Sequence, residues 1–494
     1  MTKIIFWIDN SFSNFFLAKK LNENSEFEIH SIFDVSDNPK KYFQNQTFVK
    51  FSSDNFYHDH MNEINTEPDI EYLKKKESEY NLNFMELLLN DRHFYNFNDF
   101  HNFTENQVFK ILELEIKFFE SILEKINPDY VIMRHVFLRN GYLFNLICKS
   151  KGIKILIPIP TRLGNRCIIS DDLNNLGRPS LSNNENKIND TDFNNFKTKY
   201  DLKTTEQEIG DRFLQSRSEM LKASTNYLFS SNSDLNTHYT HIGRTKYQVF
   251  KNYFFDIFRT KIRKNFIDKN FKYNLPQNLK YVYFPLHVEQ EHTLLIYAPF
   301  FTNQLELIKN ILKSLPIDYK LVIKEHPRMY NRSWHSIEFY KEILNLPNTI
   351  LIHPSLDSNE LLSNCALTIA IRSSITFEAG YYDKPAIICT KTDYDFLPHV
   401  FRLTDITELP KLIRNALDVK INNSDFRNYL LHLENNSFDF EPDGLAQDLS
   451  DLFYYGGYYT NVEISDENIV KFYKKSFELI SKLSDQFKKN IITN

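Results

Sequence analysis

Two segments in the second half of the chain combine buried strands with residue types that hold a phosphate. LVIKEHPR, residues 321–328, reads as a strand that ends in a cluster containing His326. TIAIRSSITFEAGYYDKPAII, residues 368–388, reads as a second strand that becomes a helix at Ser373 and Ser374. Such a junction offers hydroxyls, unpaired backbone N–H groups and the positive end of a helix to an anion. The pair therefore predicts a nucleotide-phosphate site.

Each of these residues also has a structural interpretation. Pro327 disfavours a helix at His326 and keeps its imidazole at the strand end, where it can donate to a phosphate or protonate a leaving oxygen. A buried core histidine is the more common alternative. The two serines can simply cap the helix. Glu378, four residues after Ser374 and on the same helical face, is either a ribose ligand or a surface carboxylate.

The spacing of the two motifs favours a common site. His326 and Ser373 are 47 residues apart (373 − 326), which accommodates a helix, a strand, a helix and a further strand. In open α/β sheets, ligands bind outside the carboxyl ends of the strands. Several other polar residues follow predicted strands of this half: His287, Glu289, Glu291, Lys324, Glu325, His353 and Arg372.

Strand-like and helical patterns alternate through both halves. In the first half, we expect strands at Lys3–Ile8, residues 27–34 and residues 47–51. Thr104 and Gln107 form a capping box that opens an amphipathic helix, and further strands follow at 130–133 and 154–159. A second series runs from residue 280 to about 390. A chain of 494 residues exceeds one core, so we expect an α/β protein with two doubly wound Rossmann-type lobes that face a cleft.

Composition excludes several functional classes. The net charge of −5 gives no field that would attract nucleic acid. The four cysteines are far apart and suggest neither a disulfide framework nor a zinc site, which fits a reducing cytoplasm. The start MTKIIFWIDNSF reads as a core strand and not as a secretory signal. No window approaches eighteen uninterrupted apolar residues, so we expect no membrane span and a cytoplasmic protein.

The segments LKYVYFPLHVEQEHT, LVIKEHPR, LPNTILIHP and RSSITFEAGYYDKPAII resemble, in order and spacing, the bacterial capsule polysaccharide biosynthesis proteins. This resemblance implies GT-B architecture and a CMP-activated acidic sugar donor. It implies that His326, Ser373 and Ser374 contact the donor, that Glu378 matches an acidic residue of the motif, and that Glu291 matches the glutamate of a Gln-Pro-Glu element. The sequence departs from the pattern at two positions, Gln290 and Asp383. Both departures bear on the identity of the donor.

Transfer chemistry also needs a carboxylate that deprotonates the acceptor and cations that stabilise the leaving phosphate. Asp9, at the end of the first strand, is the candidate base, with Glu291 as its rival; a turn or capping role is the alternative for Asp9. We expect Arg134, His135 and Arg139 to bind an acidic acceptor, although a solvated loop would look the same. No Asp-x-Asp pattern follows a strand, which predicts metal-independent transfer without a cofactor other than the donor.

Residues 244–264 interleave basic and apolar side chains. Such a helix can lie on anionic lipid, which would bring the protein to the inner face of the membrane, but an interdomain helix with a solvated charged face is the favoured interpretation. The expected organisation is an acceptor-side lobe at 1–225, a helical linker at 226–275, a nucleotide-sugar lobe at 276–425 and a helical tail at 426–494 that packs on the first lobe.

The sequence thus predicts a glycosyltransferase that moves a sugar from a CMP donor to a bacterial surface, capsular or lipid-linked glycan. Two alternatives stay open. A glycerophosphotransferase that uses CDP-glycerol resembles the same His-Pro and Ser-Ser pattern, and a noncatalytic protein of a glycan assembly complex would bind nucleotide or glycan without turnover.

Overall fold

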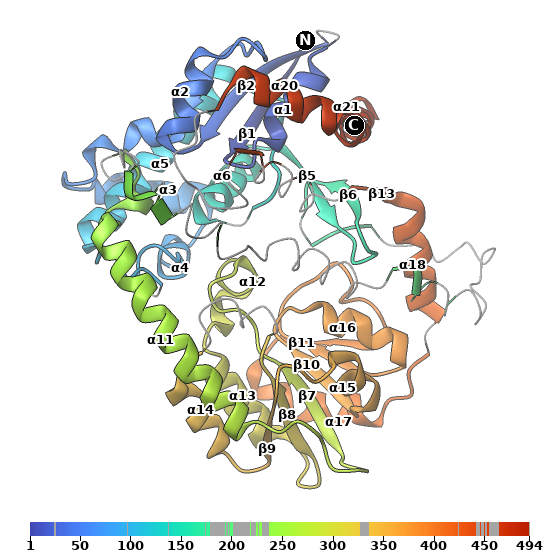
Figure 1. Cartoon of the computed structure of the whole chain (residues 1–494). Helices are drawn as coiled ribbons and strands as arrows, with labels where there is room; N and C mark the ends of the chain where they lie inside the picture. The colour runs from blue at the N-terminus through green and yellow to red at the C-terminus, as the bar shows by residue number, and fades with distance from the viewer. Residues whose placement is uncertain are drawn as a thin grey trace. The chain divides into compact units, whose positions relative to one another are not determined.

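In the computed structural model the chain forms two compact units (Figure 1). Unit 1 comprises Met1–Leu173, Lys199–Gln248 and Asn436–Asn494, and unit 2 comprises Asn174–Thr198 and Val249–Asn435. The structure describes all residues except 24, 25, 96, 137, 173, 178–192, 194, 195, 197, 201–217, 219–223, 226, 230–236, 327–334, 423, 441–444, 446–448, 450, 451, 454–463 and 494. The polar, Asn-rich composition of residues 181–195 predicts a loop and the pattern of residues 205–225 predicts a helix, and most of both segments lies outside the described residues.

Unit 1 contains a seven-stranded sheet. Five neighbouring strands are parallel and two at one edge are antiparallel. The order across the sheet is β13 (Phe438–Asp439), β6 (Arg166–Ser170), β5 (Lys154–Pro160), β4 (Tyr130–Ile132), β1 (Thr2–Asp9), β2 (Phe27–Asp34) and β3 (Asp54–Phe56).

The prediction of a strand at 47–51 is wrong, because β3 begins only at Asp54. The Gln46 side chain satisfies both backbone groups of Val49: its amide donates to the Val49 carbonyl over 2.8 Å and its carbonyl accepts from the Val49 N–H over 2.8 Å. Val49 is buried, so the apolar residues of this segment serve packing and not a strand ladder.

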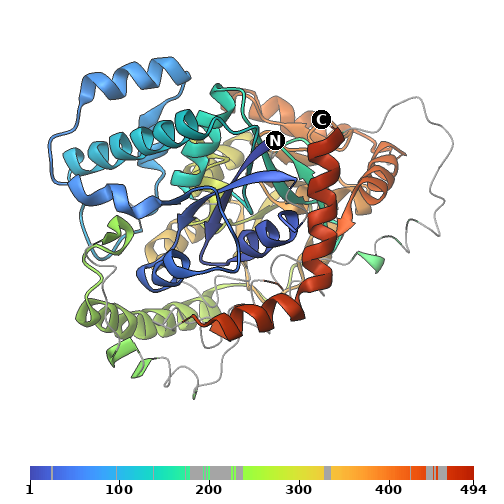
Figure 2. The ribbon, with the colours of Figure 1, turned by 90° about the horizontal axis from the view of Figure 1, so that it is seen from above.

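Strand β1 is buried on both faces, and its side chains alternate between two cores. Ile4, Phe6 and Ile8 lie in a core with helices α1 (Ser13–Leu21), α20 (Asp466–Lys475) and α21 (Phe477–Thr493). Ile5 and Trp7 lie in the other core with α5 (Glu105–Ile126) and α6 (Arg139–Ser150). The capping box predicted at Thr104 and Gln107 is present at the start of α5. The C-terminal helices therefore pack on the first lobe, as predicted (Figure 2).

Smaller elements are also present among the described residues of unit 1. They are α2 (Asp37–Asn45), η1 (Tyr57–Glu63), α3 (Ile70–Tyr80), α4 (Phe84–Leu89) and η2 (Tyr239–His241). The last of these, η2, contributes Tyr239 to the same core as α5 and α6.

Unit 2 contains a six-stranded sheet in which every neighbouring pair is parallel. The order is β12 (Val400–Arg402), β11 (Ala386–Ile388), β10 (Leu367–Ala370), β7 (Tyr281–Pro285), β8 (Lys320–Lys324) and β9 (Thr349–Ile352). Helices α13 (Gln304–Ser314), α14 (Ile337–Leu344) and α17 (Leu409–Asp418) cover one face, and α15 (Ser358–Asn364) and α16 (Ser374–Glu378) the other. The α/β class with two doubly wound lobes is confirmed.

The topology of each sheet indicates where a ligand is expected to bind. In both units the first strand lies centrally, the next two follow on one side, and the fourth lies on the other side. The order in which strands are added reverses at such a switch point, and in open α/β sheets this opens a crevice at the carboxyl ends of the two central strands. The switch points lie between β1 and β4 in unit 1 and between β7 and β10 in unit 2.

Helix α11 (Lys246–Asn270) falls within the range expected to be a helical linker. Within the described part of the chain, no helix is long and apolar enough to cross a membrane.

Candidate functional site

In unit 2, His287 connects the two strands of the switch point. It follows β7, and its Nε2 accepts a hydrogen bond over 3.2 Å from the backbone N–H of Arg372, which follows β10. Burial, with a smaller effect of the positive charge of the nearby His326, lowers the pKa of His287 to about 4. The imidazole is therefore neutral at physiological pH, as its acceptor role requires. His287 was noted at a strand end in the sequence but had no assigned role.

His326 is positioned through its neighbour Glu325. The fully buried Glu325 carboxylate accepts the backbone N–H of His326 over 2.8 Å, Nδ1–H of His335 over 2.7 Å and the hydroxyl of Tyr340. The other ring nitrogen of His335 lies 3.4 Å from the Glu289 carboxylate in the loop after β7. His326 itself is half-buried, and Pro327, the residue expected to hold it, lies outside the described residues.

The buried pair of Glu325 and His335 should make unit 2 sensitive to alkaline pH. Although burial opposes it, the carboxylates of Glu325 and Glu289 raise the pKa of His335 from 6.5 to about 10. The pair's contribution to stability is therefore fully present below pH 6.5 and is lost as pH rises through about 10. We expect His335→Ala to lower the free energy of unfolding by about 3–5 kcal/mol at pH 6, because it leaves a buried carboxylate unpaired.

Urea denaturation at pH 6 and at alkaline pH measures this effect. His30→Ala is the matched control, because burial lowers the pKa of this buried histidine. A His335→Ala variant that lost stability no more than His30→Ala would contradict the prediction.

Lys324, at the end of β8, lies on the side of the sheet covered by α15 and α16. Its Nζ donates to the Ser358 hydroxyl over 2.6 Å, and only 3% of the residue is exposed. The Tyr283 side chain of β7 packs in the same region, where burial and the charges of Cys365 and Glu378 raise its pKa. Of the predicted nucleotide ligands, Lys324 thus bonds to Ser358 on the face of the sheet that also carries Tyr283.

Ser373 and Ser374 occupy the junction of β10 and α16, as expected, and the capping interpretation holds for Ser373. Its hydroxyl accepts the Ile375 N–H over 3.4 Å. Its carbonyl accepts the hydroxyls of Thr376 and Tyr394 over 2.8 and 3.0 Å. Helix α16 has only five residues, so the helix dipole contributes little here. Both serines are half-buried and are not sealed inside the core.

Two further strand-end residues have structural partners. Glu291 is the N-cap residue of α12 (His292–Leu295), where its carbonyl accepts two backbone N–H groups. In the same loop, the Glu289 carboxylate lies 3.4 Å from Nε2 of His335. His353, after β9, bonds to Asp268 over 3.2 Å and stacks on Tyr273.

In unit 1, the switch point brings together three residues that the sequence predicted. The Oδ2 atom of Asp9, at the end of β1, lies 3.7 Å from Nε of Arg134 and 3.5 Å from Nε2 of His135, both after β4. Burial alone would raise the pKa of Asp9, but these cations and two hydrogen bonds from Ser11 lower it. Asp9 is therefore an ionised carboxylate beside the Arg134 guanidinium and the His135 ring, and Nη2 of Arg134 in turn donates to Nε2 of His135 over 2.7 Å.

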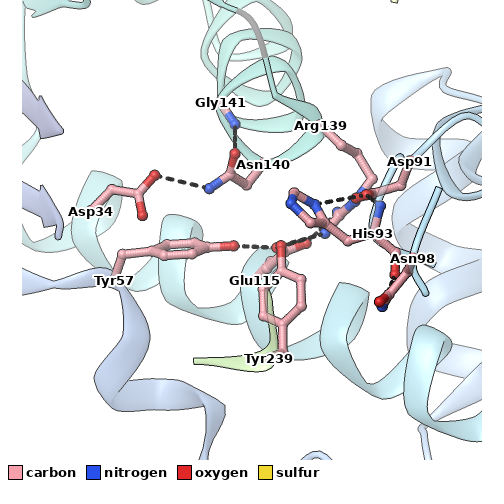
Figure 3. A network of polar contacts seen from close by, with 10 residues as sticks. All are labelled: Asp34, Tyr57, Asp91, His93, Asn98, Glu115, Arg139, Asn140, Gly141 and Tyr239. Carbon is pink, nitrogen blue, oxygen red and sulfur yellow. Dashed lines mark hydrogen bonds and ion pairs between the residues drawn. The ribbon is translucent and has the colours of Figure 1, made fainter. Parts of the chain in front are cut away.

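The sequence reasoning missed Asp34, the last residue of β2 (Figure 3). Its carboxylate accepts the Asn140 amide over 3.2 Å and lies 3.1 Å from Nε2 of His58. Burial and the negative charge of Asp9 raise the pKa of Asp34 to about 6, against the hydrogen bond from Asn140. A carboxyl group that titrates near neutral pH is suited to accept a proton from a substrate hydroxyl.

Arg139, expected to bind an acceptor, is engaged elsewhere. Only 4% of its side chain is exposed. Its guanidinium bonds to the Asp91 carboxylate over 2.5 Å and to both oxygens of Glu115, and it donates to the Tyr239 hydroxyl over 3.2 Å (Figure 3). The first residue of α6 thus ties three other segments of unit 1 together. This placement argues for a structural role and against acceptor binding.

Comparisons with known proteins complete the description of the site. The β-Kdo 2,7 transferase KpsC of Thermosulfurimonas dismutans is 12% identical over 64% of this chain and 89% of that chain, with a TM-score of 0.29. The UDP-GlcNAc 2-epimerase of Methanocaldococcus jannaschii is 13% identical over 88% and 99%, with a TM-score of 0.25. The α,α-trehalose-phosphate synthase of Burkholderia vietnamiensis is 10% identical over 91% and 98%, with a TM-score of 0.28. At these scores the likeness supports no conclusion about activity.

None of the curated proteins matches this sequence. Residues 194–398 match the family model described as capsule polysaccharide biosynthesis protein. The matched range contains both the Lys324–His326 and the Ser373–Ser374 strand ends. This match confirms, over residues 194–398, the resemblance to the capsule polysaccharide biosynthesis proteins that the strand-end motifs indicated.

Proposed function

We propose that the protein is a glycosyltransferase that moves an acidic sugar from a CMP donor to a bacterial surface or capsular glycan. The observation that carries the proposal is the polar cluster at the unit 2 switch point, where His287, His326 and Ser373 follow three neighbouring strands. The family match over the same residues supports a role in polysaccharide synthesis.

On the donor side, the leaving phosphate would be held by groups of different character. Lys324 supplies a cation, His326 an imidazole that can donate a proton, and Ser373 and Ser374 supply hydroxyls. The neutral His287 holds the backbone of Arg372 and so orients the start of the serine junction. Glu378 would accept hydrogen bonds from ribose hydroxyls.

On the acceptor side, unit 1 offers a base and the Asp9 site. Arg134 and His135 both face the Asp9 carboxylate, and their side chains would contact an acidic acceptor. Asp34 would take the proton from the acceptor hydroxyl. The acceptor oxygen then forms a bond to the sugar carbon. At the same time the bond from that carbon to the phosphate oxygen breaks, and CMP leaves. Metal independence of this transfer stays a prediction, which an assay with and without EDTA checks.

Nucleotide binding to unit 2 should be visible as thermal stabilisation. Among CMP, CDP, UDP, GDP and ADP, the cytidine nucleotides should raise the Tm of the wild type most, since a ligand at a hundredfold excess over its Kd stabilises by about 2.7 kcal/mol. His326→Ala and Ser373→Ala should each erase the shift. His353→Ala is the matched control, because its His-Pro strand end is bonded to Asp268 and should leave the shift unchanged.

If cytidine nucleotides raised the Tm of the His326→Ala and Ser373→Ala variants as much as that of the wild type, these residues would have only a structural role. That result would overturn the proposed donor site. Product analysis tests the reaction itself, since glycosyl transfer releases free CMP and leaves no phosphate in the product. A phosphodiester in the product would indicate a glycerophosphotransferase, and binding without turnover across donors would indicate a noncatalytic protein.

A further inference from the structure

Helix α11 exposes an unusual amount of apolar surface. Seven of its large apolar side chains are between 49% and 74% exposed, and the only buried residue of the helix is Ile267. The consecutive residues 253–259 are all exposed. The exposed apolar side chains are Tyr247, Tyr253, Phe254, Phe255, Ile257, Phe258 and Ile262.

Four of these side chains lie along one side of the helix. Tyr247, Phe254, Phe258 and Ile262 follow one another at intervals of seven, four and four residues, which is the spacing of a single helical face. We call them the aromatic stripe. The rings of Phe254 and Phe258 contact each other with centroids 4.9 Å apart. A stripe of this kind is costly in water, so it indicates a binding surface.

The charge of the helix identifies the partner. Residues 246–270 contain seven basic and two acidic side chains, a net charge of +5, whereas the whole chain carries −5. At 100° per residue, Lys251 lies within the aromatic stripe and Lys261 beside it. Lysine stems can lie along an apolar surface while their ammonium groups reach outward to phosphates.

We propose that α11 lies on an anionic lipid surface, with the aromatic stripe at the boundary of headgroups and acyl chains and the lysines at the lipid phosphates. An interdomain helix with a solvated face, favoured from the sequence, accounts for exposed charges but not for seven exposed apolar side chains. A second copy of this chain is disfavoured as the partner, because two helices of charge +5 would repel each other. The proposal does not depend on the transferase chemistry.

The test is sedimentation of the full-length protein with vesicles. Binding should be strong to equimolar phosphatidylcholine and phosphatidylglycerol, weak to phosphatidylcholine alone, and reduced by salt. Lys251→Glu/Lys261→Glu should lower the partition coefficient at least about fivefold for each lysine removed. Phe254→Ser/Phe258→Ser should lower the partition coefficient as strongly. The salt dependence of binding should stay, because this variant loses only the apolar contribution to binding.

Matched variants elsewhere control for general effects. Lys74→Glu/Lys75→Glu reverses two exposed charges on α3, and Ile317→Ser removes an exposed apolar side chain outside α11. Both should bind as wild type. All four α11 positions are exposed, so circular dichroism should show an unchanged fold. Equal binding to both vesicle types, or wild-type binding by the α11 variants, would overturn the proposal. Light scattering that showed a dimer lost only in the α11 variants would overturn it in favour of a second copy.

Discussion

Replacing Asp34 with asparagine should lower kcat about 10²–10⁴-fold, the range typical for the loss of a general base, and should leave the fold intact. Asparagine keeps the size of the side chain and an oxygen for the Asn140 amide, so the neighbourhood of β2 and α6 is preserved. It removes only the ability to take a proton. Steady-state kinetics with a CMP-sugar donor, together with a urea denaturation curve, separates the two effects.

The pH profile provides a second readout for Asp34. Its carboxyl must be ionised to act as a base, so kcat/KM of the wild type should rise with pH through an apparent pKa of about 6. Asp34→Asn should lose this limb of the profile.

Asp9→Asn is the informative comparison, since the pKa of Asp9 is lowered and its carboxylate holds Arg134 and His135. This variant should mainly raise KM for the acceptor. A loss of kcat with Asp9→Asn but not with Asp34→Asn would return the base role to Asp9, as the sequence first indicated.

The sequence contained a signal for Asp34 that went unused. KIIFWID and FEIHSIFD are both buried strands that end in aspartate, and in parallel pairing Asp9 and Asp34 fall opposite each other in the register of β1 and β2. Strand ends are predictable because apolar runs stop there. Which of two strand-end carboxylates is desolvated enough to titrate near neutral pH depends on contacts from distant segments, and no local pattern encodes these.

In unit 2, too, local patterns predict the strand ends, whereas the contacts between distant side chains are not encoded locally. Its strands, helices and strand-end motifs follow from periodicity and turn residues. The bond of His287 to the Arg372 backbone and the pair of Glu325 and His335 depend on side chains brought together only by the folded sheet. His335 lies after the segment 327–334, and nothing in its spacing distinguishes it from a surface histidine.

Arg139 is the case in which the sequence suggested the wrong partner. It follows a strand end, so an acceptor ligand was a reasonable prediction. The better signal lies in the preceding helix, where Glu115 falls on the apolar side, three residues after Leu112 and four before Phe119. A carboxylate on a buried helical face needs a buried cation, and Arg139 supplies it with a guanidinium that bonds to both carboxylate oxygens.

Replacing Arg139 with alanine should therefore destabilise unit 1 by about 3–5 kcal/mol, because Asp91 and Glu115 would stay buried without their cation. Urea denaturation measures this loss. Arg139 also lowers the pKa of Asp91 against the effect of burial. In the wild type this stabilisation is present above pH 3.8 and is lost as pH falls through the lower pKa of Asp91 in the folded protein. On acidification, Arg139→Ala should therefore lose less stability than the wild type does.

Variants that separate charge from packing give the decisive comparison. Arg134→Ala, which removes a more exposed arginine at the Asp9 site, should cost less stability than Arg139→Ala, because the Asp9 side chain keeps 26% of its surface exposed. Arg139→Met combined with Asp91→Asn and Glu115→Gln should recover part of the stability lost in Arg139→Ala, since no charge is then left buried without a partner. If Arg139→Ala instead kept full stability and lost only acceptor affinity, the arginine would be an acceptor ligand after all. The full burial of Glu115 and the near-complete burial of Asp91 favour the loss of stability, because neither carboxylate has water to replace the guanidinium.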